Sequence, residues 1–271
     1  MRRKQVDLHL HTNASDGTWS AKQLVDGISR AGIGMMAITD HETTANVLEA
    51  EYYAKKASIE FLRGAEISST EGTQIYHILG YHFDLNNKRL LELLHHTTFL
   101  LEEQDDKTVI QLAEKGWEID LKDYANYKYD RRLGGWKSLN YLIEKGHCKD
   151  VTEFFKKIFN KDNDLGFPIF PSIPEVIDTI HHAGGIALLA HGGSQLHGPG
   201  LIKTMDKLGK YEFDGFECYH PNHTDEVRDT LLAYCVERNL LISGGSDCHG
   251  EFVKTRHIGE PKIYKDMIKL K

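Results

Sequence analysis

The chain has 271 residues, of which 40% are hydrophobic and 27% are charged. These values are typical of a soluble globular protein that is large enough to bury a full core. Its formal net charge of −7 argues against a surface that grips long duplex nucleic acid, because that binding mode needs many lysines and arginines. Small phosphorylated molecules and short oligonucleotides remain open as substrates.

The sequence also indicates a compartment. Its four cysteines contain no C-x-x-C pair, which favours buried reduced thiols over disulfides or a thiolate zinc site. No stretch approaches the roughly 18 apolar residues of a membrane span. The basic residues 1–4 precede a charged strand rather than the apolar run of a signal peptide. We therefore expect a cytoplasmic protein without membrane contact, and the oligomeric state stays open.

The first predicted strand covers residues 6–12, where apolar side chains alternate with Asp7, His9 and His11. A capping box at residues 20–23 then begins a helix. Strand and helix patterns alternate through much of the remaining chain. The other predicted strands are residues 35–39, 59–63, 75–82, 186–190, 213–219 and 240–243.

The alternation stops between the fourth and fifth predicted strands. Residues 86–165 have apolar side chains at helical spacing and read as a helical insertion. We expect this insertion to cap the substrate site, while residues 1–85 and 166–271 form the metal-binding domain. Polar clusters follow the strands, and in parallel α/β barrels the reacting groups collect where the strands end. The predicted fold is therefore a distorted (β/α)7 TIM-like barrel with a helical insertion between strands 4 and 5.

Side chains of two types, imidazole and carboxylate, gather at the predicted strand ends. They are His9, His11, Asp16, His41, Glu66, His77, His191, Asp247 and His249. Such ligands without cysteine suit manganese, iron or zinc rather than a thiolate zinc site. Nine ligands are too many for one ion, so we predict two to three divalent transition metal ions. The alternative is a polar strand face with hydrogen-bonded histidines.

The motifs at these positions strongly resemble those of the PHP (polymerase and histidinol phosphatase) family. They are H-x-H-T-x-x-S-D-G at residues 9–17, T-D-H at 39–41, G-x-E at 64–66, H-x-L-G-Y at 77–81, A-H at 190–191 and G-S-D-x-H at 245–249. The chain looks most similar to the subgroup with a helical insertion between the fourth and fifth strands. That subgroup includes phosphatases of 3',5'-nucleoside bisphosphates and 5'-to-3' exonucleases of very short RNA.

The resemblance also implies how the ligands are shared. The implied set is His9, His11, Glu66 and Asp247 for the first ion, Glu66, His77 and His191 for the second, and Asp16, His41 and His249 for the third. A metal-bridging hydroxide is then the nucleophile, so no side-chain nucleophile is needed. Two departures leave substrate choice open, because residues 190–192 read Ala-His-Gly in place of Ala-His-Pro, and residues 135–137 read Gly-Trp-Lys in place of Arg-Pro-His.

Two further groups are candidates for substrate binding. In the insertion, basic side chains could bind phosphate and a tryptophan could stack on a nucleobase; they are Arg131, Arg132, Trp136 and Lys137. Near the ends of the fifth and sixth strands, histidines could contact a phosphate; they are His197, His220 and His223. Glu217 could support a metal ligand. The alternatives are solvated loops and, for Trp136, the core of the insertion.

These observations predict a metal-dependent phosphoesterase, a hydrolase that removes a phosphate from a small phosphorylated metabolite. A nucleotide, such as a 3',5'-nucleoside bisphosphate, or a short oligonucleotide fits best. One alternative within enzymes is histidinol-phosphate phosphatase. Another is a metal-binding PHP module without turnover.

Overall fold

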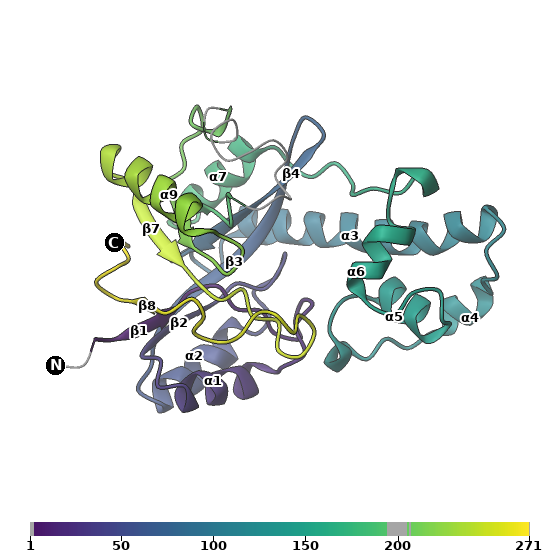
Figure 1. The fold of residues 1–271 in the computed structure, drawn as a ribbon, viewed down its shortest axis with the longest axis horizontal. Coiled ribbons are helices and arrows are strands. Elements are labelled where there is room, and N and C mark those ends of the chain that lie inside the picture. Colours follow the sequence, from purple (N-terminus) through teal and green to yellow (C-terminus); the bar gives the residue numbers. More distant parts are fainter. Residues whose placement is uncertain (1–2, 194–204, 206, 271) are drawn as a thin grey trace.

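The computed structural model describes residues 3–193, 205 and 207–270. Its strands are β1 Gln5–Asp7, β2 Met35–Ile38, β3 Glu60–Glu71, β4 Gln74–Tyr81, β5 Ile186–Leu189, β6 Gly215–Tyr219, β7 Leu241–Gly244 and β8 Ile263–Tyr264. The helices that pack around these strands are α1 Ala21–Arg30, α2 Val47–Lys56, α7 Ile173–His182 and α9 Asp225–Glu237. Figure 1 shows this α/β body with a separate helical region extending from one side.

The strands form one sheet in the order β7-β6-β5-β4-β3-β2-β1-β8. This arrangement confirms the predicted α/β barrel with one correction, because the prediction had seven parallel strands. β4 runs antiparallel to both β3 and β5, since a short hairpin turn joins β3 to β4 and leaves no room for the crossover that parallel pairing needs. An eighth strand, β8, pairs antiparallel with β1.

Backbone contacts between the segments that follow β1 and β7 nearly close the barrel. Leu8 N donates to Gly244 O at 3.2 Å, and Asp247 N donates to His9 O at 2.8 Å. A side chain at Gly245 would place its Cβ 2.3 Å from His9 N. Glycine is therefore required where these two segments meet. The first and last parts of the metal-binding motifs become neighbours at this seam.

The two faces of the strands bury their side chains in different places. In β2, Met35 and Ala37 join a cluster drawn from β1, β3, β4, β5, β7 and β8, which is the barrel interior. Met36 and Ile38 face the other way and pack with α1 and α2. The continuous apolar run of this strand is thus explained by burial on both faces.

The helical region in Figure 1 is the part of the chain between β4 and β5. Its elements are α3 Lys88–Glu114, α4 Leu121–Asn126, η1 Arg131–Leu133, α5 Lys137–Glu144, α6 Val151–Glu153, η2 Phe154–Ile158 and η3 Lys161–Asn163. Near its start, α3 packs Leu90 and Leu94 against the barrel helices. Near its end, the same helix contributes Val109 and Leu112 to a separate core of the insertion. Among the helices that the structure describes, none is long and apolar enough to cross a bilayer.

Candidate metal centre

Four buried side chains converge at the mouth of the barrel. His9 Nε2 lies 3.1 Å from His11 Nε2 and 3.0 Å from Glu66 Oε2. His11 Nε2 lies 3.2 Å from the same Glu66 oxygen and 3.1 Å from Asp247 Oδ1. Metal bonds of about 2.1 Å place the ligands of one ion about 3 to 4 Å apart. The four atoms therefore have the spacing that a single cation requires.

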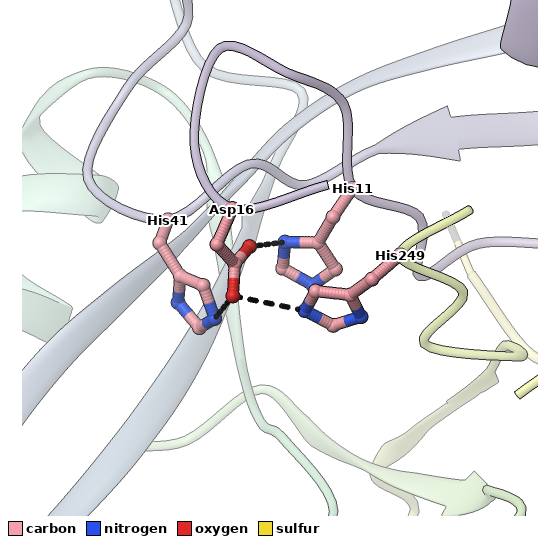
Figure 2. A group of neighbouring side chains, drawn as sticks. All are labelled: His11, Asp16, His41 and His249. Carbon is pink, nitrogen blue, oxygen red and sulfur yellow. Dashed lines mark ion pairs between the residues drawn. The ribbon is translucent and has the colours of Figure 1, made fainter. Parts of the chain in front are cut away.

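A second group surrounds the carboxylate of Asp16 (Figure 2). Asp16 Oδ2 lies 3.2 Å from His249 Nε2 and 4.0 Å from His41 Nε2, and Asp16 Oδ1 lies 3.6 Å from His11 Nδ1. Figure 2 shows all three rings turned toward this carboxylate. His11 therefore stands between two groups, with one ring nitrogen facing each.

Glu66 connects the first group to a third. Its Oε1 atom lies 2.9 Å from His191 Nε2 and 3.1 Å from His77 Nδ1. Its other oxygen, Oε2, lies beside His9 and His11 as described above and 3.5 Å from His41 Nδ1. One carboxylate thus offers a separate oxygen to each of two neighbouring groups. All nine side chains predicted as ligands lie in these three groups.

Local structure positions these side chains in two ways. His11, His41 and His191 follow β1, β2 and β5, as expected for groups at the ends of parallel strands. Glu66 and His77 instead lie inside the long β3–β4 hairpin, which corrects the expectation that every polar cluster follows a strand. The hairpin extends beyond the barrel mouth, so its middle residues reach the same level as the other strand ends.

Two of the predicted ligands occupy backbone conformations that L-residues rarely adopt. His191 has a φ of 28° and Asp247 a φ of 50°. Such conformations persist only when the surrounding structure imposes them, and they concentrate at functional sites. Each residue comes directly after a short turn out of a buried strand. The strain is consistent with side chains held for chemistry rather than for packing.

The charges in the first group stabilise one another. Burial alone would raise the pKa values of Glu66 and Asp247, but the surrounding imidazoles outweigh it and hold both pKa values well below their usual range. Burial alone would lower the pKa of His11, but the carboxylates of Asp247 and Glu66 raise it to about 10. Without a metal, protons on imidazoles balance buried carboxylates. A bound cation can take over that role.

The donor set fits transition metal ions. The buried Nδ1 atom of His11 makes no hydrogen bond within the described residues, although buried polar atoms normally have a partner. It faces an oxygen of Asp16 at 3.6 Å, and Nδ1 of His77 faces an oxygen of Glu66 at 3.1 Å. Imidazole and carboxylate ligands suit manganese, iron and zinc. The buried clusters are therefore consistent with a site for several metal ions.

Glu217 supports two of the predicted ligands, which is the role the sequence indicated for it. It is fully buried; its Oε1 lies 2.9 Å from His9 Nδ1, and its Oε2 accepts a hydrogen bond of 2.7 Å from His191 N. A partner on Nδ1 leaves Nε2 of His9 free to face Glu66 and Asp247. Carboxylates in this position orient imidazole ligands and increase their basicity.

Two further residues at the site were missed by sequence reasoning. Asp40 is buried and accepts hydrogen bonds from Thr12 N at 2.7 Å and from Ser15 Oγ at 2.7 Å, which holds the loop that carries Asp16. Its place in the T-D-H motif was the available signal. Arg256 forms an ion pair with Asp247. It lies in a loop without a recognisable pattern, so only the structure could find it.

The predicted substrate residues of the insertion differ in their surroundings. Arg131 donates to Ala14 O at 2.8 Å and so lies beside the loop that carries Asp16. Arg132 is bonded to Asp130 through two nitrogens. Lys137 lies 3.6 Å from an oxygen of Asp106 and over the Tyr124 ring, contacts that belong to the insertion itself. Trp136 packs against the insertion core.

The histidines predicted as substrate-binding residues near the fifth and sixth strands also differ in their contacts. His220 Nε2 lies 3.1 Å from Asp247 Oδ2, so this ring touches a predicted metal ligand. His223 Nε2 accepts from Gly193 N at 3.2 Å and its Nδ1 lies 3.0 Å from Cys218 O. His223 is thus held by backbone groups of β6 and of the segment that follows β5. His197 lies outside the described residues.

An α/β barrel with imidazole and carboxylate groups gathered at its mouth is typical of one class of protein. Its converging groups are buried imidazoles and carboxylates with the spacing of metal ligands. No serine or cysteine is among the side chains that form these three groups. Metal ions in such sites activate water and stabilise charge on a reacting phosphoryl or carbonyl group. The class is that of metal-dependent hydrolases.

Comparisons with known proteins identify the family. The family model of the PHP domain matches residues 7–166, more than half of the chain. The chain therefore belongs to the PHP family, as its motifs predicted. It aligns with a presumed metal-dependent phosphoesterase from Bifidobacterium adolescentis with a TM-score of 0.83 and 27% identity, over 97% of this chain and 93% of that one. The protein is a metal-dependent phosphoesterase.

Three relatives of known activity match nearly the whole chain. The 5'-3' exoribonuclease of Haemophilus influenzae is 31% identical, over 91% of this chain and 90% of that protein. The phosphoribosyl 1,2-cyclic phosphate 1,2-diphosphodiesterase of Eggerthella lenta is 27% identical, over 93% of this chain and 97% of that protein. The 3',5'-nucleoside bisphosphate phosphatase of Chromobacterium violaceum is 24% identical, over 94% of this chain and 90% of that protein.

Proposed function

We propose that this chain hydrolyses a phosphate ester of a nucleotide, either a 3',5'-nucleoside bisphosphate or a short oligonucleotide. The observation that carries the proposal is the placement of Glu66 between two groups of imidazoles, with one oxygen turned to each. A carboxylate in this position could serve two adjacent ions, and paired ions would stabilise the attacking and the leaving oxygen in phosphoester hydrolysis. The activities of the relatives from Haemophilus influenzae and Chromobacterium violaceum support the nucleotide as substrate class.

Under this proposal each group of side chains would hold one ion. The sets are those that the family resemblance implies: His9, His11, Glu66 and Asp247; Glu66, His77 and His191; and Asp16, His41 and His249. When bound, the ions supply an activated water and neutralise charge on the phosphoryl oxygens. Manganese, iron and zinc all suit these donors.

The remaining residues of the mouth orient ligands and substrate. Glu217 holds His9 and His191 in place through its two oxygens. Arg256 and His220 both contact Asp247 Oδ2, so a cation and a nitrogen donor stand beside the oxygen that faces away from His11. His220 Nδ1 accepts a hydrogen bond from Asn222 N, so its Nε2 carries the ring proton and donates to Asp247, which orients that ligand. Arg256 would contribute its positive charge beside a phosphate that reaches the first group.

A substrate panel tests the proposal. Purified protein with added Mn²⁺ is assayed on a nucleoside 3',5'-bisphosphate, a 5'-phosphorylated pentanucleotide, phosphoribosyl 1,2-cyclic phosphate, histidinol phosphate and an aryl phosphate. We expect the highest kcat/KM for one of the two nucleotides. Asp247→Ala should abolish turnover, whereas His95→Ala, an exposed residue of α3, should retain it. A higher kcat/KM for the cyclic sugar phosphate or for histidinol phosphate would show that the substrate is not a nucleotide.

A further inference from the structure

Aromatic side chains form a row that begins beside the metal centre and crosses the insertion. The ring centroid of Phe252 lies 6.5 Å from that of His249 and 6.4 Å from that of Trp136. Trp136 is 5.9 Å from Phe155, and Phe155 is 6.1 Å from Phe167. We call Phe252, Trp136, Phe155 and Phe167 the aromatic row. Its members come from the loop after β7, the start of α5, η2 and the segment after η3.

Packing does not fully cover the aromatic row. Trp136 and Phe252 are partly buried against the core of the insertion. Phe155 and Phe167 lie at the edge of that core, with ring centroids 5.8 and 4.9 Å from Phe159, and they remain 39% and 49% exposed. Exposed phenylalanines that adjoin one another and continue from a candidate active site indicate a binding surface.

We propose that the aromatic row is a stacking surface for the bases of a short single-stranded oligonucleotide whose reacting phosphate lies at the metal centre. The inference rests on the proposed function. It selects the oligonucleotide among the nucleotide substrates. Aromatic rings bind single strands in this way without regard to sequence, because every base has a π-face.

The spacing of the rings favours an extended strand. Neighbouring centroids in the aromatic row are 5.9 to 6.4 Å apart, wider than the roughly 3.4 Å step between stacked bases along one strand of a duplex. Bases that follow the aromatic row are therefore unstacked from one another, as in proteins that recognise single strands. A duplex cannot follow this spacing.

Exposed lysines lie at the far end of the aromatic row. Lys156 follows Phe155 directly and is exposed. A hollow of about 550 Å³ next to Phe167 is lined by Lys107 and Gln104, and also by two carboxylates, Glu103 and Asp164, of which Asp164 is paired with Lys115. Lys107 and Lys156 are also exposed on the same part of the insertion. Two available ammonium groups can thus meet phosphates where the exposed rings are.

Kinetics on substrates of two lengths test the aromatic row. We compare Phe155→Ala, Phe167→Ala and the double variant with wild type on a nucleoside 3',5'-bisphosphate and on a 5'-phosphorylated pentanucleotide. Loss of a stacked base weakens binding by about five- to 150-fold. We expect KM for the pentanucleotide to rise by at least about fivefold with kcat little changed, and both constants for the bisphosphate to stay at wild-type values.

Two matched controls separate stacking from packing. Phe155→Leu with Phe167→Leu keeps apolar bulk without a π-face, so it should behave like the alanine variants. Phe99→Ala removes a ring of α3 that is 48% exposed and outside the aromatic row, so it should behave like wild type. Full activity of the leucine variant would overturn the stacking role, as would an equal loss in Phe99→Ala. Thermal melting verifies that each variant is folded.

Binding without turnover separates this inference from the proposed function. Anisotropy of a 3'-labelled, 5'-phosphorylated pentanucleotide is measured in EDTA on wild type and the double alanine variant. We expect the variant to bind at least about fivefold more weakly. Equal affinities of wild type and variant would overturn the stacking role, even if wild type hydrolyses nucleotides. Weaker binding by the variant would support the stacking role, even if wild type does not hydrolyse nucleotides. A wild-type dimer that becomes monomeric in the double variant would assign the aromatic row to a second copy of the chain instead.

Discussion

At the scale of single residues, two buried glutamates organise the centre. Glu66 presents its oxygens to imidazoles of two groups, and the positive charge of those rings lowers its pKa against the effect of burial. Glu217 is not in contact with the ligand atoms that would bind an ion. It acts through His9 Nδ1 and His191 N instead. The first residue is placed to bind metal and the second to hold the ligands.

The role of Glu217 predicts a specific defect for Glu217→Gln. A glutamine side chain has one acceptor oxygen, so it cannot accept from both His9 and His191. We expect metal affinity to fall by about 10- to 100-fold, with activity restored at high Mn²⁺ concentration. The measurement is the Mn²⁺ dependence of turnover, with the exposed Glu237→Gln as control. An unchanged Mn²⁺ requirement would show that Glu217 does not position the ligands.

At the scale of elements, the insertion meets the barrel through the turn that follows η1. Gly135 N donates to Asp16 O at 2.8 Å. A Cβ at Gly134, whose φ is 73°, would lie 2.7 Å from Phe252 Cβ. A residue with a side chain cannot approach the loop that carries Asp16 this closely. Gly135, the first residue at the position of the expected Arg-Pro-His motif, and the preceding Gly134 therefore let the insertion contact that loop directly.

This contact places Arg131 beside the loop that carries Asp16, and we expect Arg131 and its exposed neighbour Arg132 to contribute to substrate choice. We expect Arg131→Ala with Arg132→Ala to lower kcat/KM for a nucleoside bisphosphate by about ten- to more than a hundredfold, since a charge-assisted hydrogen bond contributes about 1.5 to 3 kcal/mol. An aryl phosphate should be much less affected, because it has no second phosphate. The two single variants show how much each arginine contributes, and Arg238→Ala, at the residue that follows α9, is the control. Equal losses on both substrates would exclude recognition of a second phosphate.

A second element-scale prediction concerns the junction of α3 and α5. Asp105 accepts a hydrogen bond from Ser138 N at 3.0 Å, and burial raises the pKa of Asp105 to about 6. The pKa of Asp105 in the folded chain lies above its unfolded value of about 3.9. The contribution of Asp105 to the free energy of unfolding is therefore complete below pH 4 and is lost as pH rises through 6. The slope from this group is up to about 1.4 kcal/mol per pH unit.

Asp105→Asn removes this titration while preserving an acceptor for Ser138 N. The free energy of unfolding from denaturant titrations should decrease between pH 4 and 6 less steeply in the variant than in wild type. Wild type and variant with identical pH profiles would show that Asp105 does not carry a raised pKa. Asp178→Asn, at a carboxylate that is 66% exposed, is the matched control.

At the scale of the whole molecule, the ligands tie distant parts of the chain together. His9 and Asp247 lie on opposite sides of the seam that closes the barrel. The first group thus exists only when that seam is formed. Ions bound there stabilise the folded chain and not the unfolded one.

Metal removal should therefore lower thermal stability. An ion at 100 times its Kd contributes about 2.7 kcal/mol, which corresponds to roughly 5 to 10 °C in Tm for a chain of this size. The measurement is Tm with and without EDTA. Asp247→Ala should show a smaller difference because one site is lost. An EDTA-independent Tm in protein whose metal content is confirmed would contradict the prediction.

The sequence by itself determined the class of fold and the set of side chains at the barrel mouth. Each of the nine predicted ligands lies in a short motif beside a predicted strand. Such a motif is recognised from neighbouring residues alone. The alternation in residues 6–12 and the apolar run of β2 could therefore be interpreted without any distant contact. The same holds for the helical insertion, whose apolar spacing is also local.

Only the tertiary structure decided how these parts meet. A strand pattern has no direction, so the antiparallel placement of β4 could not be predicted from its residues. Arg256 reaches Asp247 within the irregular loop between β7 and β8, and Phe252 of the same loop reaches Trp136 of the insertion. The aromatic row likewise draws on four separated segments of the chain. Such contacts depend on the packing of whole elements, because side chains far apart in sequence become neighbours only when the barrel and the insertion have formed.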